Sequence, residues 1–122
     1  MIVRDAMSSP VINLRDTDSA LTGLRALVQN RISGAPVVSS NAHLVGIVTE
    51  FDLLLAIDYV GEAVPIAHVM HKDVTSVRPD TSLEEARHIL LDHHFRILPV
   101  VEGENVVGVV ARRDILRVHF GL

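Results

Sequence analysis

The 122-residue sequence predicts a mixed fold of helices and strands, α/β (α+β), built from two copies of one small unit. The first observation is an internal repeat, because Met7 aligns with Met70 and the match continues at the same offset through two Pro-Val-Val segments. The second is that apolar residues recur at helical spacing between short β-branched runs. The repeat divides the chain into a first copy, residues 1–60, and a second copy, residues 61–122.

The first copy predicts a short strand, a helix, a β-hairpin and a second helix. Residues 1–18 form an extended lead-in, with a short strand over 11–14. Capping residues at 16–19 begin a helix over 19–31, and strands over 36–39 and 44–48 pair across a turn at 40–43. The last helix begins at Thr49 and runs to Tyr59. The apolar stripe of the first helix consists of Leu21, Leu24, Leu27 and Val28.

The second copy repeats this order, with a strand over 74–77, a hairpin of 99–101 with 106–111, and a closing helix over 112–120. Ser82 and Glu85 match a capping box at the start of its first helix. The apolar stripe of that helix consists of Leu83, Ala86, Ile89 and Leu90. Helices on one face leave the other face of each unit bare, so we expect the two copies to cover each other about a pseudo-twofold axis.

A strand that passes directly into a helix is the motif on which the functional prediction depends. In the segment from Gly46 to Asp52, Thr49 suits the helix N-cap and the Asp52 carboxylate lies in the first turn. Unpaired amides at such a helix start favour anionic or hydroxyl-rich ligands, and a carboxylate accepts strong hydrogen bonds from two vicinal hydroxyls. The segment from Gly108 to Asp114 repeats the motif, with Ala111 in place of the hydroxyl residue.

Together, these features resemble a tandem pair of CBS domains, the module named after cystathionine β-synthase. The resemblance rests on the two methionine lead-ins, on residues 32–38 and 95–101, and on the two strand-to-helix motifs. It implies a homodimer of such pairs and clefts between repeats that bind AMP, ADP, ATP or S-adenosylmethionine. It also implies that ligand binding regulates a partner protein, which the sequence does not identify.

The resemblance also implies which residues contact the ligand. Asp52, helped by Thr49, would hold the ribose of the better site, and Asp114 would hold it in the weaker one, where Ala111 removes the hydroxyl. The arginines Arg96 and Arg113 match positions near phosphate. The residues expected against the adenine are Gly34, Ala35 and Pro36 in the first copy and Ile97, Leu98 and Pro99 in the second.

Simpler interpretations remain open for several of these residues. Thr49 and Asp52 also fit a plain helix cap, and Arg96 also fits an ion pair with Asp92. Two arginines, at 112 and 113, stand at a helix start where cations are disfavoured, which indicates an anion or an acidic partner nearby, or else a solvated surface. The seven histidines include neighbours at 68 and 71 and at 88, 93 and 94, which we assign to the surface rather than to a metal site.

Composition narrows the classes of function. The chain has no cysteine, no stretch long enough to span a membrane and a formal net charge of −4, which argues against a general nucleic-acid binder. It contains no nucleophile elbow and no phosphate-binding loop, so we expect no enzyme activity. The sequence therefore predicts a cytoplasmic, regulatory binding module for an adenosine-containing ligand. The second hypothesis is a ligand-free module for dimerisation or docking.

Overall fold

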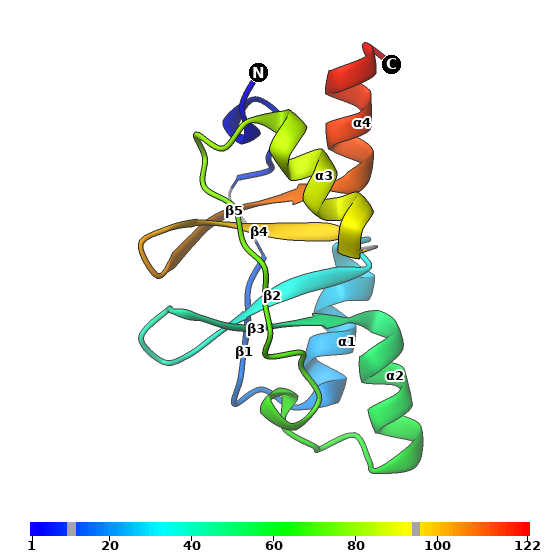
Figure 1. The fold of residues 1–122 in the computed structure, drawn as a ribbon. Coiled ribbons are helices and arrows are strands. Elements are labelled where there is room, and N and C mark those ends of the chain that lie inside the picture. The colour runs from blue at the N-terminus through cyan, green and yellow to red at the C-terminus, as the bar shows by residue number, and fades with distance from the viewer. Residues whose placement is uncertain (10–11, 94–95) are drawn as a thin grey trace. The chain divides into compact units, whose positions relative to one another are not determined.

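The computed structural model describes residues 1–9, 12–93 and 96–122 and confirms the mixed α/β fold (Figure 1). Its α-helices and hairpins follow the predicted order, and the closing helix has the predicted bounds. The lead-in predicted to be extended over 1–18 is wrong at Val3–Asp5, which form a short 3-10 helix. The α-helices are α1 (Ala20–Gln29), α2 (Glu50–Tyr59), α3 (Leu83–His93) and α4 (Arg112–Phe120). The strands are β1 (Leu14–Arg15), β2 (Gly34–Val38), β3 (Leu44–Thr49), β4 (Ile97–Glu102) and β5 (Asn105–Ala111), and the short 3-10 helices are η1 (Val3–Asp5) and η2 (Ile66–His68).

Contacts between residues divide the chain into two compact units that do not coincide with the two sequence copies. The β2–β3 unit consists of Ile12–Val74, and the β4–β5 unit consists of Met1–Val11 with Thr75–Leu122. Each unit therefore joins one copy's helices and hairpin to the lead-in that precedes the other copy.

In the β2–β3 unit, β2 lies between β1, to which it is parallel, and β3, to which it is antiparallel. Helices α1 and α2 pack together and cover an aliphatic core. The buried core residues are Leu14, Ala20, Leu27, Ala35, Val37, Val48, Leu53 and Ile66. This core fixes the end of β3 and the start of α2, where the Thr49 motif lies.

In the β4–β5 unit, the strand predicted over 74–77 is replaced by a single parallel bridge from Val77 to Val100. In the other unit, the Asp16 amide continues the equivalent ladder by donating to the Val38 carbonyl at 3.1 Å. The residue at the matching position here is Pro79, which has no amide hydrogen, so the ladder ends earlier. The buried core residues are Val3, Ala6, Val77, Leu83, Ala86, Leu90, Leu98, Val100, Val110 and Ile115.

The predicted apolar stripe of α1 is wrong at Val28, which is 60% exposed. The helix instead buries Ala20, Gly23 and Leu27. A Cβ atom at Gly23 would lie only 2.8 Å from the Ile66 Cδ1 atom, so the small residue lets η2 approach closely. In the other unit, the stripe of α3 is confirmed. In the first copy, the strand predicted over 11–14 forms at Leu14–Arg15, and Val11 lies outside the described residues.

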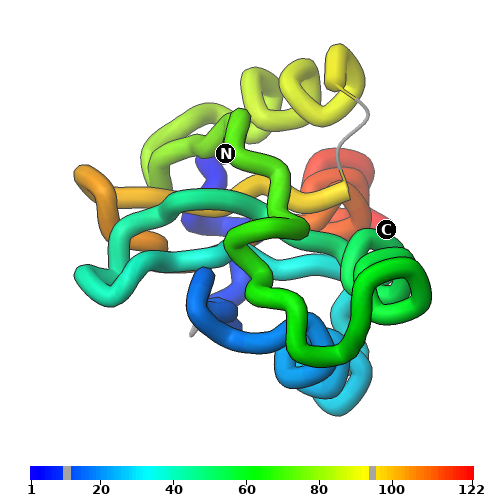
Figure 2. The backbone as a smooth tube through the Cα atoms, turned by 90° about the horizontal axis from the view of Figure 1, so that it is seen from below, coloured from blue at the N-terminus to red at the C-terminus, as the bar shows by residue number. Residues whose placement is uncertain are grey.

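The motif glycines mark the points where a lead-in crosses a strand. A Cβ atom at Gly46 would lie 2.5 Å from the Met70 sulfur and 3.0 Å from the His71 carbonyl oxygen. At Gly108, it would lie 2.9 Å from the Ser8 carbonyl oxygen and 3.0 Å from the Met7 sulfur. Figure 2 shows that the chain after α2 runs back against the β2–β3 hairpin. At this point, Ile47 and His71 form a backbone bridge. The matching positions of methionine and glycine in both copies therefore reflect one packing contact made twice.

We expect Gly46→Ala to destabilise the protein by about 1–3 kcal/mol, because the added methyl group overpacks the contact with Met70. Urea unfolding measures this change. In a double-mutant cycle, Met70→Ala should reduce the cost of Gly46→Ala, because it removes the crowded side-chain atoms. Costs that simply add would contradict the packing explanation.

Candidate functional site

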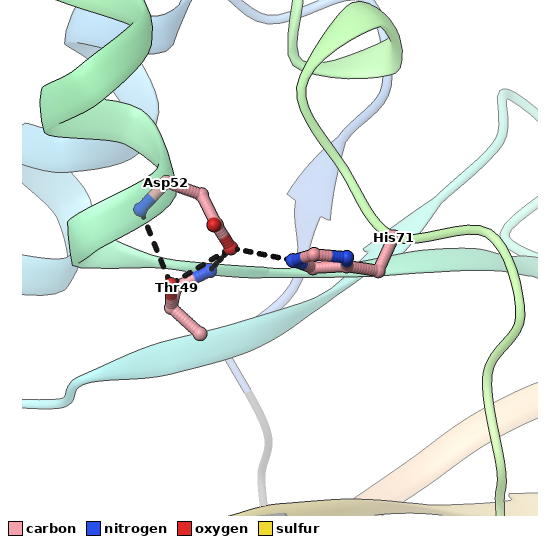
Figure 3. A network of polar contacts seen from close by, with 3 residues as sticks. All are labelled: Thr49, Asp52 and His71. Carbon is pink, nitrogen blue, oxygen red and sulfur yellow. Dashed lines mark hydrogen bonds and ion pairs between the residues drawn. The ribbon is translucent and has the colours of Figure 1, made fainter.

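The Thr49 motif folds into a reciprocal cap at the start of α2 (Figure 3). The Thr49 hydroxyl accepts from the Asp52 amide at 3.2 Å and donates to Asp52 Oδ2 at 2.8 Å. The Thr49 amide also donates to Oδ2, at 3.2 Å. The cap predicted for these residues is thus confirmed, and it fixes the orientation of the carboxylate.

A third residue, His71, reaches the same carboxylate from the lead-in segment (Figure 3). Its Nε2 atom lies 3.0 Å from Asp52 Oδ2, and its backbone makes two hydrogen bonds with Ile47, of 3.0 and 2.9 Å. Since a carboxylate oxygen only accepts, Nε2 carries the hydrogen in this contact. Oδ2 thus receives three donors, whereas Oδ1 accepts no hydrogen bond from the described residues. Oδ1 therefore keeps its capacity to accept hydrogen bonds.

The hairpin brings the second predicted segment to this cap. Gly34 is in register with Thr49, and the Glu50 amide donates to the Ser33 carbonyl at 2.9 Å. Gly34, Ala35 and Pro36 are all buried, and the Ala35 side chain belongs to the core. The pairing with β1 covers only the last two residues of β2, so the first three extend beyond it along that edge. They can offer backbone groups rather than side chains to a planar ligand.

The equivalent segments of the β4–β5 unit meet in the same way. Ile97 is in register with Ala111, and the Arg112 amide donates to the Arg96 carbonyl at 2.8 Å. Leu98 and Pro99 are fully buried, while Ile97 is partly buried and Arg96 is exposed. Ala111 caps α4 without a side-chain hydrogen bond.

Asp114 is held by a different partner from that of Asp52. Its Oδ1 atom lies 3.2 Å from Arg117 Nη2, one turn further along α4. Arg113, Arg112 and Arg117 line an open hollow of about 380 Å³ together with Leu116 and Leu122. Arg112 and Arg113 are both exposed and form no ion pair with the described residues, which fits the solvated-surface interpretation of these two arginines.

Among the described residues, the structure tests the ion pair considered for Arg96 and shows how the histidines are grouped. Arg96 and Asp92 form no ion pair there, so that interpretation of Arg96 is wrong. No three histidine or acidic side chains of the described residues come together as a metal site, and His94 lies outside them.

Sequence reasoning missed His71 and Arg117 as partners of the two aspartates. Arg117 carried a usable signal, because it lies three residues after Asp114 on a helix. His71 is 19 residues from Asp52, and only the bridge of its lead-in to β3 brings it there. The equivalent position in the other unit is Ser8, which makes the matching backbone bridge to Val109.

Comparison with known proteins identifies the family. The CBS-domain family model matches residues 3–59 and 66–121. The chain belongs to the CBS-domain family. Inosine-5'-monophosphate dehydrogenase of Nitrosopumilus maritimus is 47% identical over 85 residues, which are 69% of this chain and 17% of that enzyme. The chain therefore corresponds to less than a fifth of that relative's length.

Two solved CBS-pair structures share the fold and contain adenosine compounds. CBSX2, a CBS-pair protein of Arabidopsis thaliana, has been solved in complex with AMP. That complex is 29% identical to this chain, with a TM-score of 0.85 over 98% of this chain and 96% of CBSX2. The CBS domain pair of MJ0100, in complex with 5'-methylthioadenosine and S-adenosylmethionine, is 26% identical, with a TM-score of 0.89 over 99% and 97% of the two chains.

We expect Thr49→Ala to cost about 0.5–2 kcal/mol, because α2 loses its N-cap hydroxyl. Ala111→Thr should stabilise the protein by about 0.5 kcal/mol or more, because it supplies the cap that α4 lacks. Thermal unfolding of both variants beside Thr49→Ser, which keeps a hydroxyl, measures these effects. Equal stability of Thr49→Ala and the parent chain would contradict the role of the cap.

Proposed function

We propose that this chain is a regulatory module that binds an adenosine-containing ligand, AMP, ADP or ATP foremost, at the Thr49–Asp52 cap. The observation that carries the proposal is the Asp52 carboxylate, oriented by three donors on Oδ2 while Oδ1 remains open. A single carboxylate oxygen has two lone pairs, which suits the two vicinal hydroxyls of a ribose. Related CBS pairs in complex with AMP or with 5'-methylthioadenosine and S-adenosylmethionine support the same ligand class.

The adenine is proposed to lie against Gly34, Ala35 and Pro36. Their side chains are small or buried, so the contacts come from backbone groups on the part of β2 that extends beyond β1. The register of Gly34 with Thr49 places this segment beside the proposed ribose position. A flat base and a ribose can therefore be held by two adjacent strands and the helix that follows them.

A weaker second site is proposed around Asp114, with Ile97, Leu98 and Pro99 against the base. Ala111 supplies no hydroxyl to fix the carboxylate, and Arg117 occupies one of its oxygens. Arg96 and Arg113 are exposed and are proposed to contact phosphate. The weaker cap and the competing ion pair are the reasons for ranking this site second.

The proposed module signals to a partner protein rather than catalysing a reaction. In the dehydrogenase relative, the matching region is a small part of a larger enzyme, which is consistent with an accessory role. No helix among residues 1–9, 12–93 and 96–122 has the length and apolar character needed to cross a bilayer. A cytoplasmic location remains a prediction.

Homodimerisation is proposed through α2 and α4, because both helices expose apolar side chains. In α2, these are Phe51, Leu54, Leu55 and Tyr59, and the same helix carries acidic Glu50 and Asp58. In α4, Leu116 and Phe120 are exposed beside a basic set of arginines, Arg112, Arg113 and Arg117. The opposite charges favour packing of α2 of one protomer against α4 of the other protomer. Such exposed apolar faces also favour the second candidate function, a ligand-free interaction module.

Isothermal titration with AMP, ADP, ATP and S-adenosylmethionine tests the ligand proposal. We expect Asp52→Ala to weaken binding roughly 10- to 100-fold, because hydrogen bonds to a charged acceptor are lost. Asp114→Ala should affect only a second, weaker phase, and Asp58→Ala on the same helix is the matched control. Absence of binding with all four compounds would favour the interaction module instead.

Single cysteines test the dimer, because the natural chain contains none. We expect Leu55→Cys and Leu116→Cys chains to form a mixed disulfide dimer when oxidised together. Each variant oxidised alone should cross-link poorly, because α2 of one protomer faces α4 of the other protomer rather than the other α2. Non-reducing mass spectrometry distinguishes these products, and efficient cross-linking of Leu55→Cys alone would contradict the α2–α4 pairing.

A further inference from the structure

The two aspartates of the repeated motif are paired with different kinds of cation. His71 and Asp52 have side-chain exposures of 63% and 21%, and Arg117 and Asp114 have exposures of 60% and 20%. The pairs also have similar lengths, 3.0 and 3.2 Å. Their solvent exposure and separation are thus closely matched. They differ in that arginine stays charged, whereas a histidine side chain gains or loses its charge between about pH 5 and 8.

We propose that His71 is a specificity-determining residue that selects the charge of the adenosine ligand at the Thr49–Asp52 site. The inference rests on the proposed function, because it assigns a role to His71 within the same site. When His71 is neutral, the pair with Asp52 carries one negative charge. When His71 is protonated, the pair carries no net charge, and an anionic ligand no longer meets an uncompensated carboxylate.

The contact geometry supports an electrostatic role over a purely structural one. Two of the three donors that orient Asp52, the Thr49 amide and hydroxyl, remain in place without His71. The His71 backbone is fixed by its two hydrogen bonds to Ile47, which keep the imidazole beside the carboxylate. What His71 adds to the site is therefore a side chain that can carry a positive charge.

The other charged residues of the elements that carry or contact His71 belong to its own segment and to α2. Lys72 and Asp73 follow it in the chain, η2 contributes His68, and α2 contributes Glu50 and Asp58 in addition to Asp52. Strand β3, which pairs with the His71 backbone, has no charged side chain. All of these groups remain in a His71 variant, so comparison with that variant isolates the charge of His71.

The experiment compares two ligands of fixed charge, adenosine and adenosine 5'-sulfate. The sulfate ester keeps a single negative charge between about pH 5.5 and 8, so the result does not include the titration of a phosphate group. Their dissociation constants are measured by calorimetry at several values between about pH 5.5 and 8. The proteins are the parent chain, His71→Gln, which keeps an N–H donor without a charge, and Arg117→Gln as the matched control.

In the parent chain, we expect the affinity for adenosine 5'-sulfate relative to adenosine to rise about threefold or more from pH 8 to pH 5.5. In His71→Gln, this ratio should stay nearly constant, at the value of the parent chain at pH 8. Arg117→Gln should keep the pH dependence of the parent chain in the tighter binding phase, assigned to the Asp52 site, because Asp52 and His71 are unchanged. Only the weaker phase, assigned to Asp114, should differ.

The outcomes separate the inference from the function on which it rests. Adenosine binding that requires Asp52, with the same pH dependence in His71→Gln as in the parent chain, would overturn the role of His71 alone. Loss of the pH dependence in Arg117→Gln and not in His71→Gln would assign the effect to the other pair and also overturn it. Failure of both ligands to bind the parent chain would overturn the proposed function, and this inference with it.

Discussion

The crossing of each lead-in over a motif glycine is the contact on which the rest of the structure depends. At Gly46, the strand lies so close to Met70 and to the His71 carbonyl that a side chain of any size would overlap them. The backbone bridge at Ile47 then ties the lead-in to the strand, one residue after the glycine. Because the strand continues directly into α2, this one contact fixes the direction of the helix start. It also places an imidazole that is distant in sequence beside the first turn of that helix.

The Thr49–Asp52 cap has a structural role that is compatible with the proposed binding role of the same residues. The helix needs an acceptor for its free amides, and the Thr49 hydroxyl provides it. The same hydroxyl and the Thr49 amide use only Oδ2 of the carboxylate. The cap therefore leaves Oδ1 without a hydrogen bond from the described residues. The structural role seen here and the proposed binding role are compatible, because the proposal uses the other oxygen.

Local patterns in the sequence predicted most of the elements, because caps, turns and apolar spacing act over a few residues. The bounds of α2 and α4 and the pairing of both hairpins followed from Thr49, the Pro-Val-Val segments and the turn residues. The errors arose where a distant contact decided the outcome. Gly23 faces the core because Ile66 packs against it, and the second ladder ends early because Pro79 lacks an amide. Likewise, the His71–Asp52 contact depends on a bridge between segments that no local pattern joins.

Divergence between the two copies follows from the residues that stand in place of Thr49 and His71. Where the first motif has a hydroxyl cap, the second has Ala111, so Asp114 is free to turn toward Arg117 on its own helix. Where the β2–β3 unit has His71 on the crossing lead-in, the β4–β5 unit has Ser8. The repeat thus provides two carboxylates in matching positions, one held by a cap and a titratable ring, the other by a permanent cation. The proposed role of His71 therefore gives a pH response only to the Asp52 motif, because the arginine beside Asp114 keeps its charge.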